Sequence, residues 1–289
     1  MIMMFACWYS FVRAFWPDVA AATPARAFDT ASGGWPGDLA TAPAAASRQV
    51  VTSPPLVIPE RESIELLRAA GLPMVESIPV EGTDAAAMLQ PATAAAERVG
   101  WPVAVKLDAP GLAHKSDVGG VVLDIGGPKP LAAALRRLVA AGREHGAEGV
   151  LIQPMATPGV ELIAGARRDP QFGPLVLAGF GGLLAEVLDD VSIRLAPIDR
   201  DDAREMLDEL RGARLLDGQR GRPGVDRAAL VDLLVRLSQA MVANPAWREV
   251  DLNPVIASRS RVVAVDALIV SDTRDPDWDF EDPGGATGF

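Results

Sequence analysis

The feature that most constrains the fold is an alternation of amphipathic and apolar segments between residues 59 and 270. Some segments carry apolar residues at helical spacing, and others are short apolar runs of strand length. Helices are predicted over 60–70, where Gly71 is placed to stop the helix, around Leu131, Leu135, Leu138 and Val139, and, after a capping Asp226, around Leu230, Leu233, Leu234, Leu237 and Met241. Strands are predicted at 101–107, 149–153, 160–166, 175–180, 193–196, 249–255 and 262–270.

The two ends of the chain have a different composition. Residues 17–55 are rich in Ala, Pro, Gly, Ser and Thr, and residues 272–289 are acidic with Gly and Pro. Such segments bury too little apolar surface to offset the entropy lost on ordering. We therefore expect a disordered leader at 1–55, a folded part at 56–271 and a flexible tail at 272–289. The apolar run 1–16 is shorter than the roughly 20 residues that span a bilayer, so no membrane span is expected.

Charge and cysteine content exclude several classes of function. The chain has 27 basic and 38 acidic residues, a net charge of −11, which argues against a nucleic-acid binder. A small anion such as a nucleotide remains compatible, because its site needs only a few local donors. Cys7 is the only cysteine, so no disulfide framework or thiolate cluster is expected, and a cytoplasmic location fits.

Lys106 stands in an apolar strand that leads into a glycine-containing loop. Strand alternation places Lys106 on the face opposite Val103, Val105 and Leu107. Its ammonium and that of Lys115 are candidates for phosphate contacts, and the glycines at 119 and 120 permit close backbone approach to an anion. The simpler interpretation is an edge strand whose lysine lies in water.

His114 is one of two histidines, and it lies in the same loop as Lys115. An isolated loop histidine is more often a hydrogen-bonding residue than a catalyst, but loops are also where ligand-handling groups are displayed. His145 follows a polar helical segment and is expected at the surface.

A run of oxygen-bearing side chains near the C-terminus suits a hard cation. Alternation puts Glu249, Asp251 and Asn253 on one face of a strand, and Asp266 interrupts the next apolar run. A buried carboxylate without a cation or donors costs several kcal/mol. If the two strands pair as an antiparallel hairpin, Asn253 and Asp266 meet as Mg²⁺ ligands. Two ordinary polar strand ends are the alternative.

A third segment, Gly-Phe-Gly-Gly at 179–182, precedes Glu186 and Arg194. A glycine-rich turn before a helix can bind an anion, although this pattern alone is weak and the dinucleotide fingerprint is not met. Glu186 and Arg194 either pair with each other or meet a reacting group.

Taken together, these motifs resemble the ATP-grasp domain of the ADP-forming acyl-CoA synthetases, also called acetate–CoA ligases (ADP-forming), which are related to succinyl-CoA synthetase. The resemblance covers nearly all of 59–270. Its matching stretches are Gly-Trp-Pro-Val-Ala-Val-Lys at 100–106, His-Lys-Ser-Asp-Val-Gly-Gly-Val at 114–121, Arg-Asp-Pro-Gln-Phe-Gly-Pro at 168–174, Gly-Phe-Gly-Gly at 179–182 with Glu-Val-Leu at 186–188, Arg-Leu-Ala-Pro at 194–197, Glu-Val-Asp-Leu-Asn-Pro at 249–254 and Val-Asp-Ala at 265–267.

The resemblance implies an α+β ATP-grasp fold of two lobes that clasp a nucleotide, with 56–100 and 156–271 in one lobe and about 101–155 in a central one. It also implies roles for matching residues. Nucleotide-binding positions are Lys106, Lys115, Gly119, Gly120, Gln153, Met155 and Glu161; the segment from Gln153 to Met155 is the hinge that meets adenine. Metal ligands are Asn253 and Asp266, and catalytic positions are His114, Glu186 and Asp251.

The implied reaction converts an acid, CoA and ATP to acyl-CoA, ADP and phosphate through a phosphohistidine. The implied cofactors are ATP or ADP and Mg²⁺, with CoA bound by a partner α subunit, because the expected CoA-binding segments have no match in this sequence. His114 matches a second histidine that relays the phosphoryl group. Two alternatives stay open: an ATP-sensing grasp module like those attached to lysine acetyltransferases, and a stand-alone carboxylate ligase.

Overall fold

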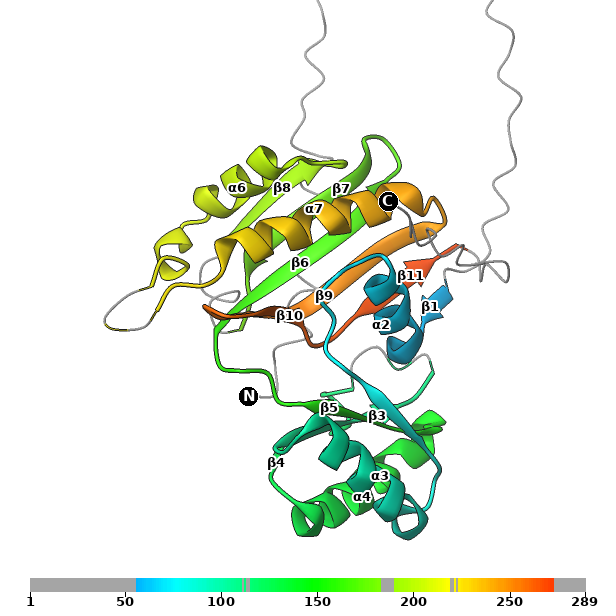
Figure 1. Cartoon of the computed structure of the whole chain (residues 1–289). Coiled ribbons are helices and arrows are strands. Elements are labelled where there is room, and N and C mark those ends of the chain that lie inside the picture. The colour runs from blue at the N-terminus through cyan, green and yellow to red at the C-terminus, as the bar shows by residue number, and fades with distance from the viewer. Residues whose placement is uncertain are drawn as a thin grey trace, which may run out of the picture. The chain divides into compact units, whose positions relative to one another are not determined.

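The computed structural model describes residues 56–110, 112, 115–182, 190–218, 221 and 223–272. The predicted leader at 1–55 and the predicted tail beyond Asp272 lie outside these residues. Within them, helices and strands form two lobes, each built on its own antiparallel sheet (Figure 1).

The large lobe contains a seven-stranded sheet with the order β1-β11-β9-β6-β7-β8, and β10 pairs with β9. The strands are β1 (Leu56–Ile58), β6 (Val160–Asp169), β7 (Gly173–Phe180), β8 (Val191–Leu195), β9 (Trp247–Ala257), β10 (Val262–Ala264) and β11 (Leu268–Ser271). Its helices are α2 (Glu60–Ala69), α6 (Arg200–Glu209) and α7 (Arg227–Ala243). Helix α7 lies across β6, β7 and β9, and α2 packs on β11 (Figure 1).

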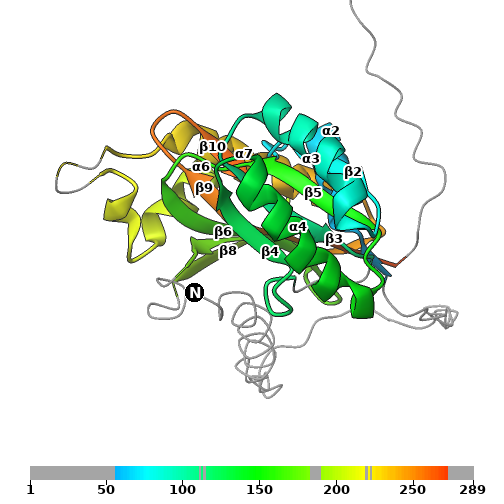
Figure 2. The same ribbon diagram turned by 90° about the horizontal axis from the view of Figure 1, so that it is seen from below.

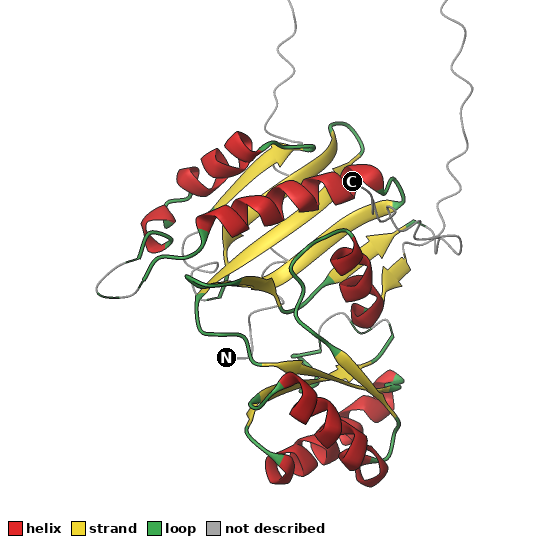
Figure 3. Ribbon diagram, viewed as in Figure 1, coloured by secondary structure: helices red, strands yellow, loops and turns green. Residues whose placement is uncertain are grey.

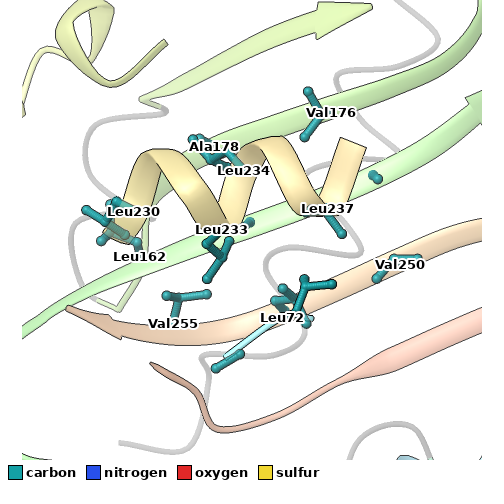
Figure 4. Packing of buried hydrophobic residues seen from close by; sticks show 14 of the residues in the cluster. Leu72, Leu162, Val176, Ala178, Leu230, Leu233, Leu234, Leu237, Val250 and Val255 are labelled. Carbon is teal, nitrogen blue, oxygen red and sulfur yellow. The ribbon is translucent and has the colours of Figure 1, made fainter. Parts of the chain in front are cut away.

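Helix α7 supplies the apolar stripe that the sequence predicts. Its side chains at Leu230, Leu233, Leu234 and Leu237 are buried against the sheet (Figure 4). The predicted cap is confirmed, because the Asp226 side chain accepts the Ala229 N–H. Burying leucines of this size contributes roughly 1.5–3 kcal/mol each, so α7 is a main source of the stability of the large lobe.

The small lobe contains a four-stranded sheet in the order β2-β5-β3-β4, with two helices on one face (Figures 2 and 3). Its elements are β2 (Ile78–Glu81), α3 (Ala85–Val99), β3 (Val103–Asp108), β4 (Val121–Ile125), α4 (Pro128–Gly142) and β5 (Gly149–Pro154). Strand β2 pairs with β5, so the small lobe begins at Ile78 instead of near residue 101. The sequence-based boundary missed β2 and α3, because α3 is built mainly from alanines that make no stripe of large side chains.

The strand predicted at 262–270 is two strands with a break at 265–267. Before the break Ala264 pairs with Val255, and after it Leu268 pairs with Asp251. Both pairs belong to the same antiparallel register. The chain therefore leaves the ladder for three residues and returns without a shift.

Helix α2 ends where the sequence predicts. Gly71 has a φ of 82° and its N–H donates to the Arg68 carbonyl, while the Leu72 N–H donates to the Leu67 carbonyl. A left-handed residue at this position is the usual glycine stop. The chain then passes β10, where Met74 forms a parallel bridge with Ala264, and enters the small lobe.

Candidate functional site

Lys106 lies on β3 with its side chain pointing away from the core of the small lobe. Val103, Val105 and Leu107 belong to that core, whereas Lys106 does not. Strand β3 is flanked by β5 and β4, and Lys106 is only 6% exposed. The predicted alternation is confirmed, and the interpretation of an edge-strand lysine in water is wrong.

The Lys106 ammonium is held by three neighbours from the large lobe. It donates to Glu60 Oε1 and to the Val265 carbonyl, each at 2.8 Å, and its Nζ lies 3.4 Å from Asp266 Oδ2. Burial acts to lower the pKa of Lys106, but the charges of Asp266 and Glu60 outweigh burial and raise that pKa above its usual value. Two of the three N–H donors of the ammonium are thus hydrogen-bonded, and Asp266 adds an ion pair.

Glu60 is the residue on which three predicted nucleotide-binding side chains converge. It is the first residue of α2, and its two carboxylate oxygens accept from Lys106 and from Lys115. The Gln153 amide lies 3.4 Å from Glu60 Oε1. Burial acts to raise the pKa of Glu60, but the charges and hydrogen bonds of both lysines outweigh burial and lower the pKa to about 2. Glu60 therefore stays ionised although it is buried.

Sequence reasoning missed Glu60 because its position has an ordinary explanation. Glu60 and Glu62 both lie in the first turn of α2, where acidic residues interact favourably with the helix dipole. The partners of Glu60 stand 46 and 55 positions later in the chain. The contact of Glu60 with Lys106 and Lys115 becomes visible only in the structure, where the two lobes bring these residues together.

The loop after β3 requires its glycines for conformational reasons. Gly119 has a φ of 69°, and a Cβ on Gly120 would lie 2.7 Å from the Lys115 carbonyl oxygen. The Gly119 N–H donates to Ser116 and the Gly120 N–H to Lys115, so both amides are used inside the turn. Their predicted contact with phosphates stays a prediction.

Two predicted catalytic residues, His114 and Glu186, lie outside the described residues. Arg194, the suggested partner of Glu186, pairs with Glu209 of α6. His145 is exposed on a short 3-10 helix, as predicted.

The predicted alternation on β9 holds over 249–252, and the register with β6 then shifts before Val255. Val250 and Leu252 are in the core of the large lobe, and Glu249, Asp251 and Asn253 occupy the alternate positions. Burial raises the pKa of Asp251 well above its usual value, and the charges of Glu249 and Asp266 add to the rise. Among the described residues no group donates to the buried Asp251 Oδ1. This face therefore gathers carboxyl groups, and the environment of Asp251 favours its neutral form.

Asp266 lies in the break between the pairs Ala264–Val255 and Leu268–Asp251, and the common register of these pairs puts the break beside Asn253, as the hairpin hypothesis requires. In the described part of the chain, no three His, Cys, Asp or Glu side chains gather as a complete metal site. Mg²⁺ fits this arrangement, because it is usually bound by one or two protein carboxylates together with substrate phosphates and waters. The orphaned Asp251 oxygen is a further sign that a cation is tolerated here. The ligand roles of Asn253 and Asp266 stay predictions.

A pocket lies where the chain crosses from β5 to β6. Its empty space, counted together with open solvent, is about 350 Å³. Its lining residues are Val75, Pro154, Met155, Ala156, Thr157, Ile256, Ser258, Arg261 and Val263. Met155 thus lines a pocket at the crossing between the lobes, and its predicted contact with adenine stays a prediction.

Unlike Met155, Gln153 and Glu161 are not among the residues that line this pocket. The Gln153 side chain is buried and its Nε2 lies 3.4 Å from Glu60 Oε1 and from Ser77 Oγ. Glu161 is exposed, and it pairs in register with Ile256, which lines the pocket. Nucleotide contacts by both residues stay predictions.

None of the described helices combines the length and the apolar character needed to cross a membrane.

The structure belongs to a class of protein with two α+β lobes, in which lysines of one lobe meet carboxylates of the other. Within that class the chain belongs to the ATP-grasp family, since the sequence profile described as ATP-grasp domain matches residues 49–270. The predicted family and the predicted α+β grasp fold are confirmed.

Relatives place the chain near the ADP-forming acetate–CoA ligases. The β subunit of acetate–CoA ligase [ADP-forming] I from Pyrococcus furiosus is 36% identical over 224 residues, which cover 73% of this chain and 97% of that subunit. Trans-feruloyl-CoA synthase FCS1 from an unknown prokaryotic organism is 42% identical over 220 residues, which cover 74% of this chain. The chain spans about 30% of the length of that synthase.

A solved structure agrees with these relatives. It is acetyl-coenzyme A synthetase 1 of Candidatus Korarchaeum cryptofilum in complex with coenzyme A and Mg-AMPPCP, with a phosphohistidine segment pointing towards the nucleotide-binding site. It is 36% identical, covers 74% of this chain and 92% of the solved chain, and gives a TM-score of 0.64.

Proposed function

We propose that this chain is the nucleotide-binding part of an ADP-forming acyl-CoA synthetase and acts with a CoA-binding partner. The observation that carries the proposal is the meeting of Lys106 and Lys115 from the small lobe with Glu60 and Asp266 from the large lobe. Phosphoryl transfer asks mainly for cations and for carboxylates that hold a metal. The junction of the lobes supplies both.

The proposed roles follow from charge. The ammonium groups of Lys106 and Lys115 bind nucleotide phosphate oxygens, because charge-assisted hydrogen bonds are the strong ones. Asn253 and Asp266 hold Mg²⁺, which when bound neutralises charge that develops on the phosphates. Asp251 stands beside them on β9 as an acid or base.

The pocket beside Met155 is the proposed site of the base. Its walls come from the crossing after β5 and from β9 and β10, so one ligand bound there touches both lobes. The lysine pair on and after β3 then lies at the phosphate end.

The proposed reaction is a transfer between a phosphohistidine and ADP. A P–N bond to an imidazole breaks, a P–O bond to the terminal oxygen of ADP forms, and the imidazole keeps the electron pair of the broken bond. His114 is the proposed relay within this chain, and a second histidine with the CoA site belongs to the partner. The phosphohistidine segment of the Korarchaeum synthetase, which points towards the nucleotide-binding site of that protein, supports the proposal.

Nucleotide binding to the purified chain is measured first, and ADP formation with the partner is measured second. We expect the purified chain to bind Mg-ATP and Mg-ADP by isothermal titration calorimetry. We expect ADP formation that needs an acid, CoA and ATP only when the CoA-binding partner is co-expressed. A purified chain that binds no nucleotide contradicts the proposal, and full activity from the chain alone contradicts the need for a partner.

The two histidines give a matched test of the relay. His114→Ala is expected to keep nucleotide binding and to lose phosphoryl transfer, while His145→Ala, at an exposed position, is expected to keep both. A sensor module or a stand-alone ligase would keep its nucleotide binding or turnover in both variants. No contact in the described residues favours either alternative.

A further inference from the structure

The lysines that the proposed function assigns to phosphate are already occupied. Lys106 donates to Glu60 and to the Val265 carbonyl, and it forms an ion pair with Asp266. Lys115 is 7% exposed and donates to the second oxygen of Glu60. A nucleotide phosphate that approaches these buried ammonium groups therefore meets Glu60 at both of them, and at Lys115 Glu60 is the hydrogen-bond partner among the described residues.

Glu60 and Asp266 differ in how tightly they are fixed. Glu60 is the buried first residue of α2, and both of its oxygens are hydrogen-bonded to lysine. Asp266 makes the longer contact with Lys106 and its side chain is 26% exposed. Asp266 is therefore the more exposed and less closely held carboxylate of the two.

The charges of this cluster also indicate which groups can separate. Two ammonium groups and the carboxylates of Glu60 and Asp266 balance in this cluster. If Asp266 turns to a cation and Lys115 to a phosphate, Glu60 and Lys106 still form a neutral buried pair. The cluster can thus release one anion and one cation together without leaving a buried charge unpaired.

We propose that the Glu60 carboxylate occupies the place of a nucleotide phosphate on Lys115, and that nucleotide binding exchanges Glu60 for phosphate at this lysine while Glu60 keeps Lys106 in position. This inference rests on the proposed function, since it concerns the same lysines. Glu60 thereby acts as a competitor for Lys115 and as a positioning residue for Lys106.

Affinity for ADP is the measurement that separates this role from a purely structural one. Glu60→Gln keeps the side-chain shape and removes the competing charge. We expect it to bind ADP about tenfold more tightly than wild type in EDTA, the size expected for one charge-assisted hydrogen bond. Glu65→Gln is the matched control, because Glu65 is exposed on the same helix.

A double-mutant cycle identifies the lysine. In a Lys115→Ala background, Glu60→Gln is expected to give no gain in ADP affinity, because the exchange no longer exists. If Glu60→Gln still increases the ADP affinity in the Lys115→Ala background, the increase reflects general repulsion between Glu60 and ADP. That result overturns the proposal. Equal or weaker ADP binding by Glu60→Gln in the wild-type background overturns it as well.

Two further measurements distinguish a misfolded variant from a failure of the exchange and from a failure of the proposed function. Thermal unfolding shows whether Glu60→Gln is folded, and if it is not, Glu60→Asp replaces it, because the shorter side chain cannot bridge both lysines. Glu60→Asp is expected to bind ADP more tightly than wild type, and weaker or unchanged binding overturns the exchange. Failure of wild type to bind Mg-ADP contradicts the proposed function instead.

Discussion

Lys106 Nζ lies 3.4 Å from Asp266 Oδ2, although Lys106 belongs to the sheet of the small lobe and Asp266 to the break between two strands of the large lobe. The contact ties a predicted phosphate-binding residue to a predicted metal ligand. It also makes the site and the joining of the lobes depend on the same buried charges.

Lys106→Met is therefore expected to lower both stability and nucleotide binding. Methionine keeps most of the apolar stem but leaves Glu60 with one lysine and Asp266 with none. Removing one partner of a buried ion pair costs about 3 kcal/mol or more in the free energy of unfolding. Urea denaturation measures the loss, with Lys129→Met as the control because Lys129 is exposed. A loss equal to that of the control contradicts the role of the cluster.

Asp266→Asn is expected to remove the dependence of ADP affinity on Mg²⁺. An amide is a weaker ligand for a hard cation than a carboxylate, so the tightening by Mg²⁺ should fall about tenfold or more. Calorimetry with ADP in Mg²⁺ and in EDTA gives the two affinities. Asp201→Asn is the control, since that side chain is 83% exposed. An unchanged ratio of affinities would show that Asp266 holds no metal.

Gly120→Ala is expected to disturb the loop that carries Lys115. The added Cβ would meet the Lys115 carbonyl oxygen at 2.7 Å, so the backbone has to shift. ADP affinity should fall several-fold, and the free energy of unfolding by about 1–3 kcal/mol. Gly126→Ala serves as the control because no atom lies within 4 Å of its Cβ position. Equal effects of the two substitutions would contradict this account.

Features that depend on residues close together in the chain can be predicted from the sequence, whereas contacts between residues distant in the chain cannot. The strand containing Lys106, the helix with Leu234 and the face carrying Asn253 follow from periods of two and 3.6 residues, which are local. Alternation also suffices to predict that Lys106 points away from its own core. Local patterns therefore indicate the candidate lysine and the candidate metal ligands.

The missed features depend on distant contacts or on small side chains. Glu60 is distinguished from Glu62 only by lysines of the other lobe. Helix α3 has Met88 as its one large buried side chain among alanines, so its stripe is weak. The break at 265–267 interrupts an apolar run whose composition is typical of one continuous strand.

The pH dependence of stability tests the setting of Asp108. This carboxylate ends β3, and Arg61 Nη1 lies 3.7 Å from its Oδ2. Burial raises the pKa of Asp108 above its usual value, although Arg61 and Lys115 oppose the rise. A raised acid pKa stabilises the fold at low pH, and this contribution is lost as the pH rises through the folded pKa.

Asp108→Asn does not titrate. Its free energy of unfolding relative to wild type should therefore increase as the pH rises from about 3 to 7. Urea denaturation across this range measures the difference, with Asp201→Asn as the control. A difference that stays constant or falls with rising pH contradicts the assigned direction of the shift.

Helix α7 allows the packing of the large lobe to be tested within one element. Leu237 is fully buried against the sheet, as Figure 4 shows, whereas Val242 on the same helix is 40% exposed. Leu237→Ala loses apolar contacts and leaves a cavity, so we expect it to lower the free energy of unfolding by about 2–5 kcal/mol. Val242→Ala leaves no cavity and should change it by less than about 1 kcal/mol. The acidic face of β9 belongs to the sheet that α7 covers. If Leu237→Ala lowers the free energy of unfolding but keeps the ADP affinity, the core stabilises the site without determining its geometry. A similar loss for both variants would contradict the assigned orientation of the helix.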